Sequence, residues 1–152
     1  MAGVLGQTVA APESYAPEVL ERIARIKAEG APEFGWDIWH AYELSWCAGA
    51  DVSHAVGWLT IPVDSPATVE SKSLKLYLNS LNHHAFENDE DAVATIMRDV
   101  SACVGAPVSL DCLPVSALND ITEELTGVNL PPCRADQGLE RIEAESLAHS
   151  PG

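Results

Sequence analysis

Basic side chains are scarce in this sequence. It has 8 Lys and Arg against 23 Asp and Glu over 152 residues, which gives a formal net charge of -15. Such a surface would repel a nucleic-acid backbone or an anionic membrane. We therefore expect no direct nucleic-acid partner and no membrane partner, and an acidic surface also favours solubility.

Long apolar runs are lacking as well. No stretch approaches the roughly 20 apolar residues that a membrane-spanning helix needs. The N-terminal sequence Met-Ala-Gly-Val-Leu-Gly-Gln has no basic region followed by an apolar block, so it does not have the pattern of a secretory signal. A cytoplasmic location is the expectation that follows.

The cysteines lack the spacing of a zinc or redox motif. The four are scattered, with no Cys-x-x-Cys pair: Cys47, Cys103, Cys112 and Cys133. A chain of this size can build a core without disulfides, so we expect reduced thiols. His83 and His84 are adjacent, and neighbouring side chains diverge, so we expect no metal site.

An apolar fraction of 47% is sufficient for one domain with a real core. We expect an N-terminal extension with a short helix over residues 1–35, a folded module over 36–130 and a flexible tail over 131–152. The short helix is predicted from Pro17 to Ile26, because proline suits a first helical turn and the apolar residues that follow share one side.

Two strands follow in the predicted module. Residues 36–46 and 54–62 flank turn residues 48–51 and should pair antiparallel. The first is predicted as a strand because several of its larger side chains share one parity: Trp36, Ile38, His40, Tyr42 and Leu44.

Two helices and a further strand come next. From Glu70 onward the spacing fits both a strand and a helix, although the residue types favour a helix. Asn88 is a good cap for a second helix, whose core-facing stripe is Val93, Ile96, Met97, Val100 and Val104. Residues 107–113 predict a strand, and 117–125 a short helix.

The most informative segment is Glu70-Ser71-Lys72-Ser73-Leu74-Lys75-Leu76-Tyr77-Leu78-Asn79-Ser80. On spacing alone it reads as a helix N-terminus with favourable charge and a solvated lysine face. As a contiguous string, however, it resembles the fingerprint of the nitrile reductases of queuosine biosynthesis, the QueF family. Tyr42-Glu43-Leu44-Ser45-Trp46 and Asp37-Ile38-Trp39 resemble the N-terminal module of the two-module members.

The resemblance implies a fold and a reaction. The fold is the α+β tunnelling fold (T-fold), an antiparallel sheet with two helices packed on one face, in modules that associate edge to edge. The reaction is the NADPH-dependent reduction of 7-cyano-7-deazaguanine (preQ0) to 7-aminomethyl-7-deazaguanine. The similarity runs from about residue 5 to about residue 115, and it resolves the ambiguity at Glu70 in favour of a helix.

The resemblance also implies site residues. Glu70 would hold the deazaguanine edge, since a carboxylate can accept hydrogen bonds from a ring N–H and an exocyclic amine together. Val69 and Ser71 would touch the base through the flanking backbone. Ser71 and Lys72 would contact NADPH, whose phosphates suit an ammonium group. In the family these sites lie between modules.

The catalytic residues of the family are not reproduced. The nucleophilic cysteine of catalytic modules lies in a Cys-x-x-Thr-x-Gln-Pro-Asp segment, and residues 47–54 here keep Cys47 without the Gln-Pro-Asp. The His-Glu pair that follows the fingerprint is also missing, with Phe86-Glu87-Asn88 in its place. We therefore assign no catalytic residue and expect the isolated chain to be inactive.

Three interpretations remain open. The chain is the N-terminal module of a nitrile reductase and contributes base and NADPH contacts to a site completed by a catalytic module or another copy. Alternatively, it is a non-catalytic T-fold binding or scaffold module. The third is a standalone enzyme that uses Cys47, with Asp51 or His54 as proton donor.

Overall fold

The computed structural model describes residues 10–26 and 34–120. Its strands are β1 (Arg22–Ala24), β2 (Trp36–Ala48), β3 (Asp51–Pro62), β4 (Ala67–Val69), β5 (Ala85–Phe86) and β6 (Ser109–Pro114). Its helices are α1 (Ser71–Ser80) and α2 (Asp89–Val104), with short 3-10 turns η1 (Pro17–Val19) and η2 (Val115–Asp120). The tail predicted after residue 130 lies outside the described residues.

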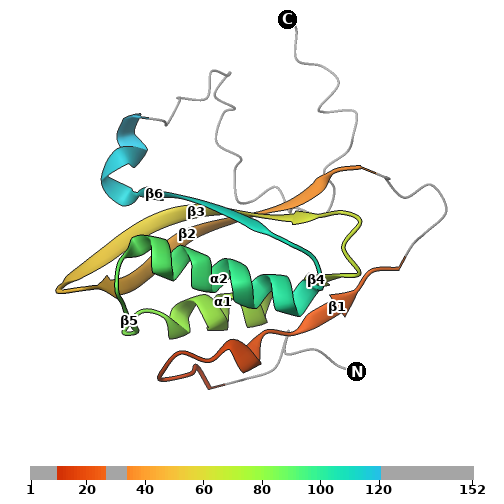
Figure 1. The fold of residues 1–152 in the computed structure, drawn as a ribbon, viewed down its shortest axis with the longest axis horizontal. Helices are drawn as coiled ribbons and strands as arrows, with labels where there is room; N and C mark the ends of the chain where they lie inside the picture. Colours follow the sequence, from red (N-terminus) through yellow and green to blue (C-terminus); the bar gives the residue numbers. More distant parts are fainter. Residues whose placement is uncertain (1–9, 27–33, 121–152) are drawn as a thin grey trace, which may run out of the picture. The chain divides into compact units, whose positions relative to one another are not determined.

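The main sheet has the order β5-β2-β3-β6 (Figure 1). β2 pairs antiparallel with β3, and β3 pairs antiparallel with β6, whereas the two-residue β5 joins β2 in parallel. Helices α1 and α2 lie together on one face of this sheet. The predicted α+β T-fold arrangement is confirmed, with the small addition of a parallel strand at one edge.

Strand β2 changes face part-way along its length. Its register with β3 runs from Ala41 opposite Gly57 to Leu44 opposite Ala55, so two residues, Tyr42 and Glu43, face one. This extra residue is a β-bulge, which reverses the alternation of side chains. Leu44 is therefore buried in the core although it has the same parity as the exposed Trp36, because the parity rule assumes an unbroken ladder.

Helix α2 forms as its sequence predicts. The Asn88 side chain accepts a hydrogen bond from the Asp91 N–H at 2.9 Å, and Gly105 ends the helix in a left-handed conformation with φ of 77°. Of the predicted stripe, Ile96, Val100 and Val104 are fully buried, while Val93 and Met97 are partly buried against the same cluster. The helix thus packs one apolar stripe on the sheet.

The helix predicted from Pro17 to Ile26 is wrong beyond Val19. A single 3-10 turn is followed by strand β1, which pairs antiparallel with β4, placing Arg22 opposite Val69. The local residue types favour a helix, but tertiary pairing with the segment before α1 overrides that weak preference. Strand β1 thereby places the N-terminal segment beside β4, the strand that leads directly to Glu70.

A polar network also holds the N-terminal segment. The hydroxyls of Tyr15 and Tyr77 donate to Oδ2 of Asp99 at 2.6 and 2.7 Å. Burial and the Asp99 carboxylate raise the pKa of the Tyr77 hydroxyl, so it stays neutral as a donor. Asp99 therefore joins the N-terminal segment, α1 and α2 at one point.

The strand predicted over 107–113 is confirmed as β6. Of the short helix predicted over 117–125, residues 117–120 belong to the 3-10 turn η2. The rest of that prediction lies outside the described residues. Within the two described ranges, no helix has the length and apolar character to cross a membrane.

Candidate functional site

Glu70 lies at the point where strand β4 ends and helix α1 begins. Its carboxylate is the N-cap of α1: Oε1 accepts from the Lys72 N–H at 2.9 Å, and Oε2 accepts from the Ser73 N–H at 2.7 Å. The Ser71 hydroxyl donates to Oε1 at 3.2 Å. The side chain is thus held in one orientation by the helix terminus itself.

Glu70 is buried yet remains charged. Its residue exposure is 5%. Burial alone would raise its pKa, but the hydrogen bonds from Lys72, Ser73 and Ser71 and the charge of Lys72 outweigh this and lower the pKa. At neutral pH the group is therefore an oriented carboxylate with acceptor capacity left, because its two oxygens offer about four lone pairs.

The other predicted site residues surround this carboxylate. Ser71 is exposed, Lys72 is half-buried, and the Val69 side chain is buried in the core. Val69 as a whole is 1% exposed and pairs with Arg22 of β1, so contact of its backbone with a base stays a prediction. Structure places Ser71 and Lys72 on the first turn of α1, the end of a helix that favours anions.

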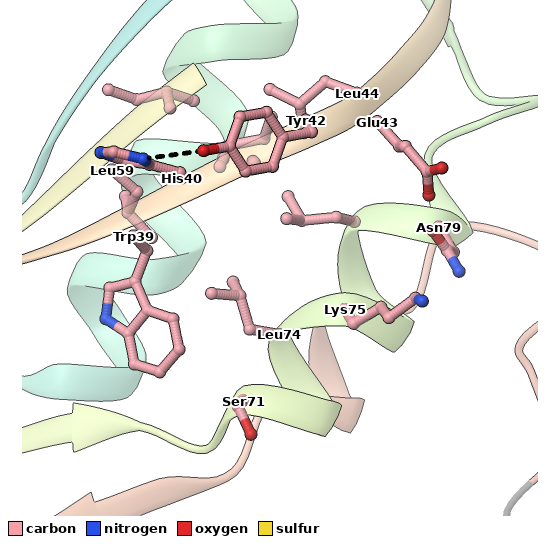
Figure 2. Close-up of a pocket in the computed structure, with 14 residues that line it drawn as sticks. Trp39, His40, Tyr42, Glu43, Leu44, Leu59, Ser71, Leu74, Lys75 and Asn79 are labelled. Carbon is pink, nitrogen blue, oxygen red and sulfur yellow. Dashed lines mark hydrogen bonds between the residues drawn. The ribbon is translucent and has the colours of Figure 1, made fainter. Parts of the chain in front are cut away.

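A cavity of about 380 Å³ lies between α1 and β2, starting beside Ser71 (Figure 2). Its apolar wall comes from both layers: Trp39, Leu44, Leu59, Leu74, Leu78 and Ile96. Glu43, Lys75 and Asn79 form its polar rim. The indole N–H of Trp39 is buried without a hydrogen-bond partner among the described residues, and its nitrogen lies on the side of the ring away from Leu74. The space next to Leu74 is therefore lined by apolar groups.

Cys47 is not part of this site. It lies near the tip of the β2–β3 hairpin, where its N–H donates to the His84 carbonyl at 3.0 Å and it pairs with Ala85 of β5. Glu70 is at the opposite end of α1 (Figure 1), and ten helical residues span about 15 Å. Within one chain, the thiol and the carboxylate are not brought together.

Metal ligation finds no support in the described part of the chain, where no group of three His, Cys, Asp or Glu side chains is placed to hold an ion. The three described cysteines, Cys47, Cys103 and Cys112, are free thiols. Burial raises the pKa of Cys103, and burial with the nearby Asp111 and Asp89 raises that of Cys112 to about 11. Both are poor nucleophiles at neutral pH.

Residues 12–112 match the family described as "Nitrile reductase, 7-cyano-7-deazaguanine-reductase N-term". The chain belongs to this family. It is 45% identical over 119 residues to the NADPH-dependent 7-cyano-7-deazaguanine reductase of Aromatoleum aromaticum, covering 72% of this chain and 42% of that protein. Reductases with the same name from Dechloromonas aromatica and Acinetobacter baumannii strain SDF are 42% identical over 126 residues and 37% identical over 148 residues.

The chain spans about half the length of these nitrile reductases. The match covers 44% of the Dechloromonas protein and 52% of the Acinetobacter protein, and 76% and 92% of this chain. Membership of the N-terminal family confirms the resemblance on which the assignment of Glu70 depends.

Two contributors to the site escaped the sequence analysis. Ser73, which lies inside the fingerprint, bonds to both the backbone and the side chain of Glu70, and Glu21 accepts the Glu70 N–H at 2.8 Å. Glu70 at the cap with Ser73 three residues later is the reverse of the Ser-x-x-Glu capping box, so the spacing alone gave no standard signal for Ser73. Glu21 gave no signal, because its contact depends on a strand that the local sequence does not predict.

Acid should destabilise the fold through Glu70 and Asp89. The pKa of Asp89 is lowered by hydrogen bonds from Ser53 and Trp46, and that of Glu70 is lowered as described. A carboxyl group with a lower pKa when folded stabilises the fold at pH values above its unfolded pKa, and this stabilisation is lost as pH falls through the folded pKa. The free energy of unfolding should therefore be steady near neutrality and decline below about pH 5.

Urea unfolding of the chain and of Glu70→Gln at several pH values would measure this effect. The variant should be less stable at pH 7, and the gap should narrow on acidification, because the wild type alone loses the Glu70 contribution. Parallel pH dependence in the two proteins would show that Glu70 has the same pKa folded and unfolded.

Proposed function

We propose that this chain is the N-terminal module of an NADPH-dependent nitrile reductase. The complete enzyme would convert 7-cyano-7-deazaguanine to 7-aminomethyl-7-deazaguanine in the cytoplasm, as a step of queuosine biosynthesis. The observation that carries the proposal is Glu70, a buried, ionised carboxylate fixed at a helix N-terminus within the family's matched region. The acidic net charge and an apolar fraction sufficient for one core both fit an enzyme that acts on a free base.

Base recognition would use Glu70, Val69 and Ser71. The carboxylate oxygens each accept one backbone N–H of α1, which leaves lone pairs for the ring N–H and exocyclic amine of the deazaguanine. The Ser71 hydroxyl can rotate away from Oε1 when the base arrives, because Ser71 is exposed. The geometry suits a ligand that presents two parallel donors.

NADPH would be held by Ser71 and Lys72. The Lys72 ammonium and the Ser71 hydroxyl both lie on the first turn of α1, where the helix dipole also favours the phosphate groups of a dinucleotide. The cofactor supplies hydride to the nitrile carbon when it is bound. The chain's own contribution is to orient the cofactor and the base next to one another.

The catalytic cysteine would come from a second module. The part of β2 before Cys47 has no strand partner on its outer side among the described residues. Exposed apolar side chains accompany this open edge, with Trp36, Ile38 and Tyr42 at 68%, 59% and 70% exposure. An added strand can pair with such an edge and place side chains in the apolar cavity behind it.

A catalytic module of the same family, or another copy of the chain, is the proposed occupant of this edge. The alternative function is a T-fold binding or scaffold module without reductase activity. Because Cys47 and Glu70 are far apart within one chain, the reductase module and the scaffold module are both favoured over a standalone enzyme. A covalent adduct on Cys47 after incubation with the nitrile, lost in Cys47→Ser, would instead support the standalone enzyme.

A chimaera tests the proposal. The matching half of the Aromatoleum aromaticum reductase is replaced by this chain, and NADPH oxidation is followed with 7-cyano-7-deazaguanine as substrate. We expect nitrile-dependent oxidation by the chimaera and none by the isolated chain. A chimaera that folds and assembles but neither binds the base nor oxidises NADPH would favour the scaffold function.

A further inference from the structure

Two buried serines of α1 contact the N-terminal segment in the same way. Ser73 Oγ donates to the Glu70 carbonyl at 2.8 Å and accepts from the Glu21 N–H at 3.0 Å. Ser80 Oγ donates to the Tyr77 carbonyl at 2.6 Å and accepts from the Ala16 N–H at 3.2 Å. We call Ser73 and Ser80 the serine clamps. They lie about two helical turns apart on one face of α1, with exposures of 0% and 4%.

Only the Ser73 clamp is connected to Glu70. The Glu70 N–H donates to the Glu21 carbonyl at 2.8 Å, and the Ser73 N–H donates to Glu70 Oε2 at 2.7 Å. With the two bonds of the Ser73 hydroxyl, these contacts form a closed ring through Glu21, Glu70 and Ser73. A displacement of Glu21 therefore acts on the Glu70 N–H directly, and on the Glu70 carbonyl and carboxylate through Ser73.

Strand β1, which pairs with β4, and Arg25, the residue after it, anchor Glu21 to the rest of the fold. The Arg25 N–H donates to the Pro66 carbonyl at 3.2 Å, and Arg25 Nε donates to Ser65 Oγ at 3.1 Å. The Arg25 guanidinium also forms an ion pair with Asp37 of β2. The ring around Glu70 is thus tied to β2 and β4 through β1.

We propose that Ser73, together with strand β1, positions the Glu70 carboxylate for the base. This inference rests on the proposed function. A carboxylate that accepts two hydrogen bonds at once needs a fixed orientation, because small angular errors weaken both bonds. Ser73 does not touch the base and acts through Glu70, whereas Ser80 performs the same bridging at the far end of α1 without contact to the site.

The serine clamps provide a matched pair of variants. Ser73→Ala and Ser80→Ala each delete one buried hydroxyl and leave one backbone N–H without its acceptor, so both should lower the urea midpoint by similar amounts. Only Ser73→Ala should raise the dissociation constant for 7-cyano-7-deazaguanine, by roughly fivefold in the chimaeric reductase. Ser80→Ala should leave that constant unchanged.

A second readout does not depend on the base. In the chain alone, an NMR titration of the Glu70 carboxyl carbon should give a higher pKa in Ser73→Ala, because the hydrogen bonds that lower the pKa are loosened. The pKa in Ser80→Ala should equal that of the wild type. If Ser73→Ala does not fold, Ser73→Cys, which keeps the size of the side chain with a weaker hydrogen-bonding group, should show smaller shifts of the same sign.

The outcomes separate this inference from the proposed function. Equal effects of both variants on base affinity, or an unchanged Glu70 titration in Ser73→Ala, would overturn the positioning role. If the Glu70 pKa changed in Ser73→Ala but not in Ser80→Ala, Ser73 would position the carboxylate. If the unmodified chimaera nevertheless did not bind the base, the proposed function would be refuted.

Discussion

Glu70→Ala should weaken binding of 7-cyano-7-deazaguanine to the assembled reductase by about 3 kcal/mol, roughly a hundredfold in the dissociation constant. The variant removes both acceptor oxygens, so under the proposed function two donors on the base edge would be left unpaired. Because Glu70 also caps α1 through Lys72 and Ser73, the variant should in addition lose about 1 kcal/mol of stability. Calorimetric titration of the chimaera with the base, beside urea unfolding, measures the two effects.

Asn88→Ala is the matched control for the loss of a helix cap. Asn88 caps α2 by accepting the Asp91 N–H, so its replacement should cost about 1 kcal/mol of stability as well. Its effect on base affinity should be negligible, since Asn88 lies at the start of the other helix. If Glu70→Ala bound the base as tightly as the wild type, the carboxylate would have no role in recognition.

Ile38→Lys should reduce association of the chain with the proposed catalytic module at least tenfold. Ile38 lies on the open part of β2 and is 59% exposed in the isolated chain. Burial of an isoleucine at an interface contributes about 1.5–3 kcal/mol, and a charge placed on an edge strand opposes pairing further. Sedimentation of the chain with a separately expressed catalytic module of a relative gives the dissociation constants.

Val52→Lys is the control for added charge and lost apolar surface. Val52 has a similar exposure of 57% but lies at the start of β3, next to the hairpin turn and away from the open part of β2. We expect association close to that of the wild type. A loss of association as large as that of Ile38→Lys would mean that general surface charge, and not the β2 edge, controls pairing.

The sequence predicted elements well where their signals are local. The Asn88 cap and the apolar stripe of α2 are signals within one helix, so helix α2 could be placed closely. The start of α1 at Glu70 was predicted for the same reason, since cap and fingerprint coincide in a few residues, and the role of Glu70 in base binding stays a prediction. The β2–β3 hairpin likewise followed from alternation on either side of a turn.

Features that depend on distant contacts were missed. Residues 22–24 form a strand only because β4 offers them a ladder, and nothing in their own composition competes with the helical preference of the surrounding residues. The bulge at Tyr42 and Glu43 is likewise set by packing against β3. The serine clamps depend on how residues 16–21 run along α1, and so they could not be predicted from local sequence.

The open β2 edge and the acidic surface have a joint consequence for the handling of this chain. An unpaired strand with apolar neighbours can template indiscriminate stacking of identical molecules, whereas a net charge of -15 keeps those molecules apart in dilute buffer. Added salt shortens the range of that repulsion to about 10 Å at 0.1 M. We therefore expect added salt to promote self-association through the β2 edge, and a low ionic strength to oppose it.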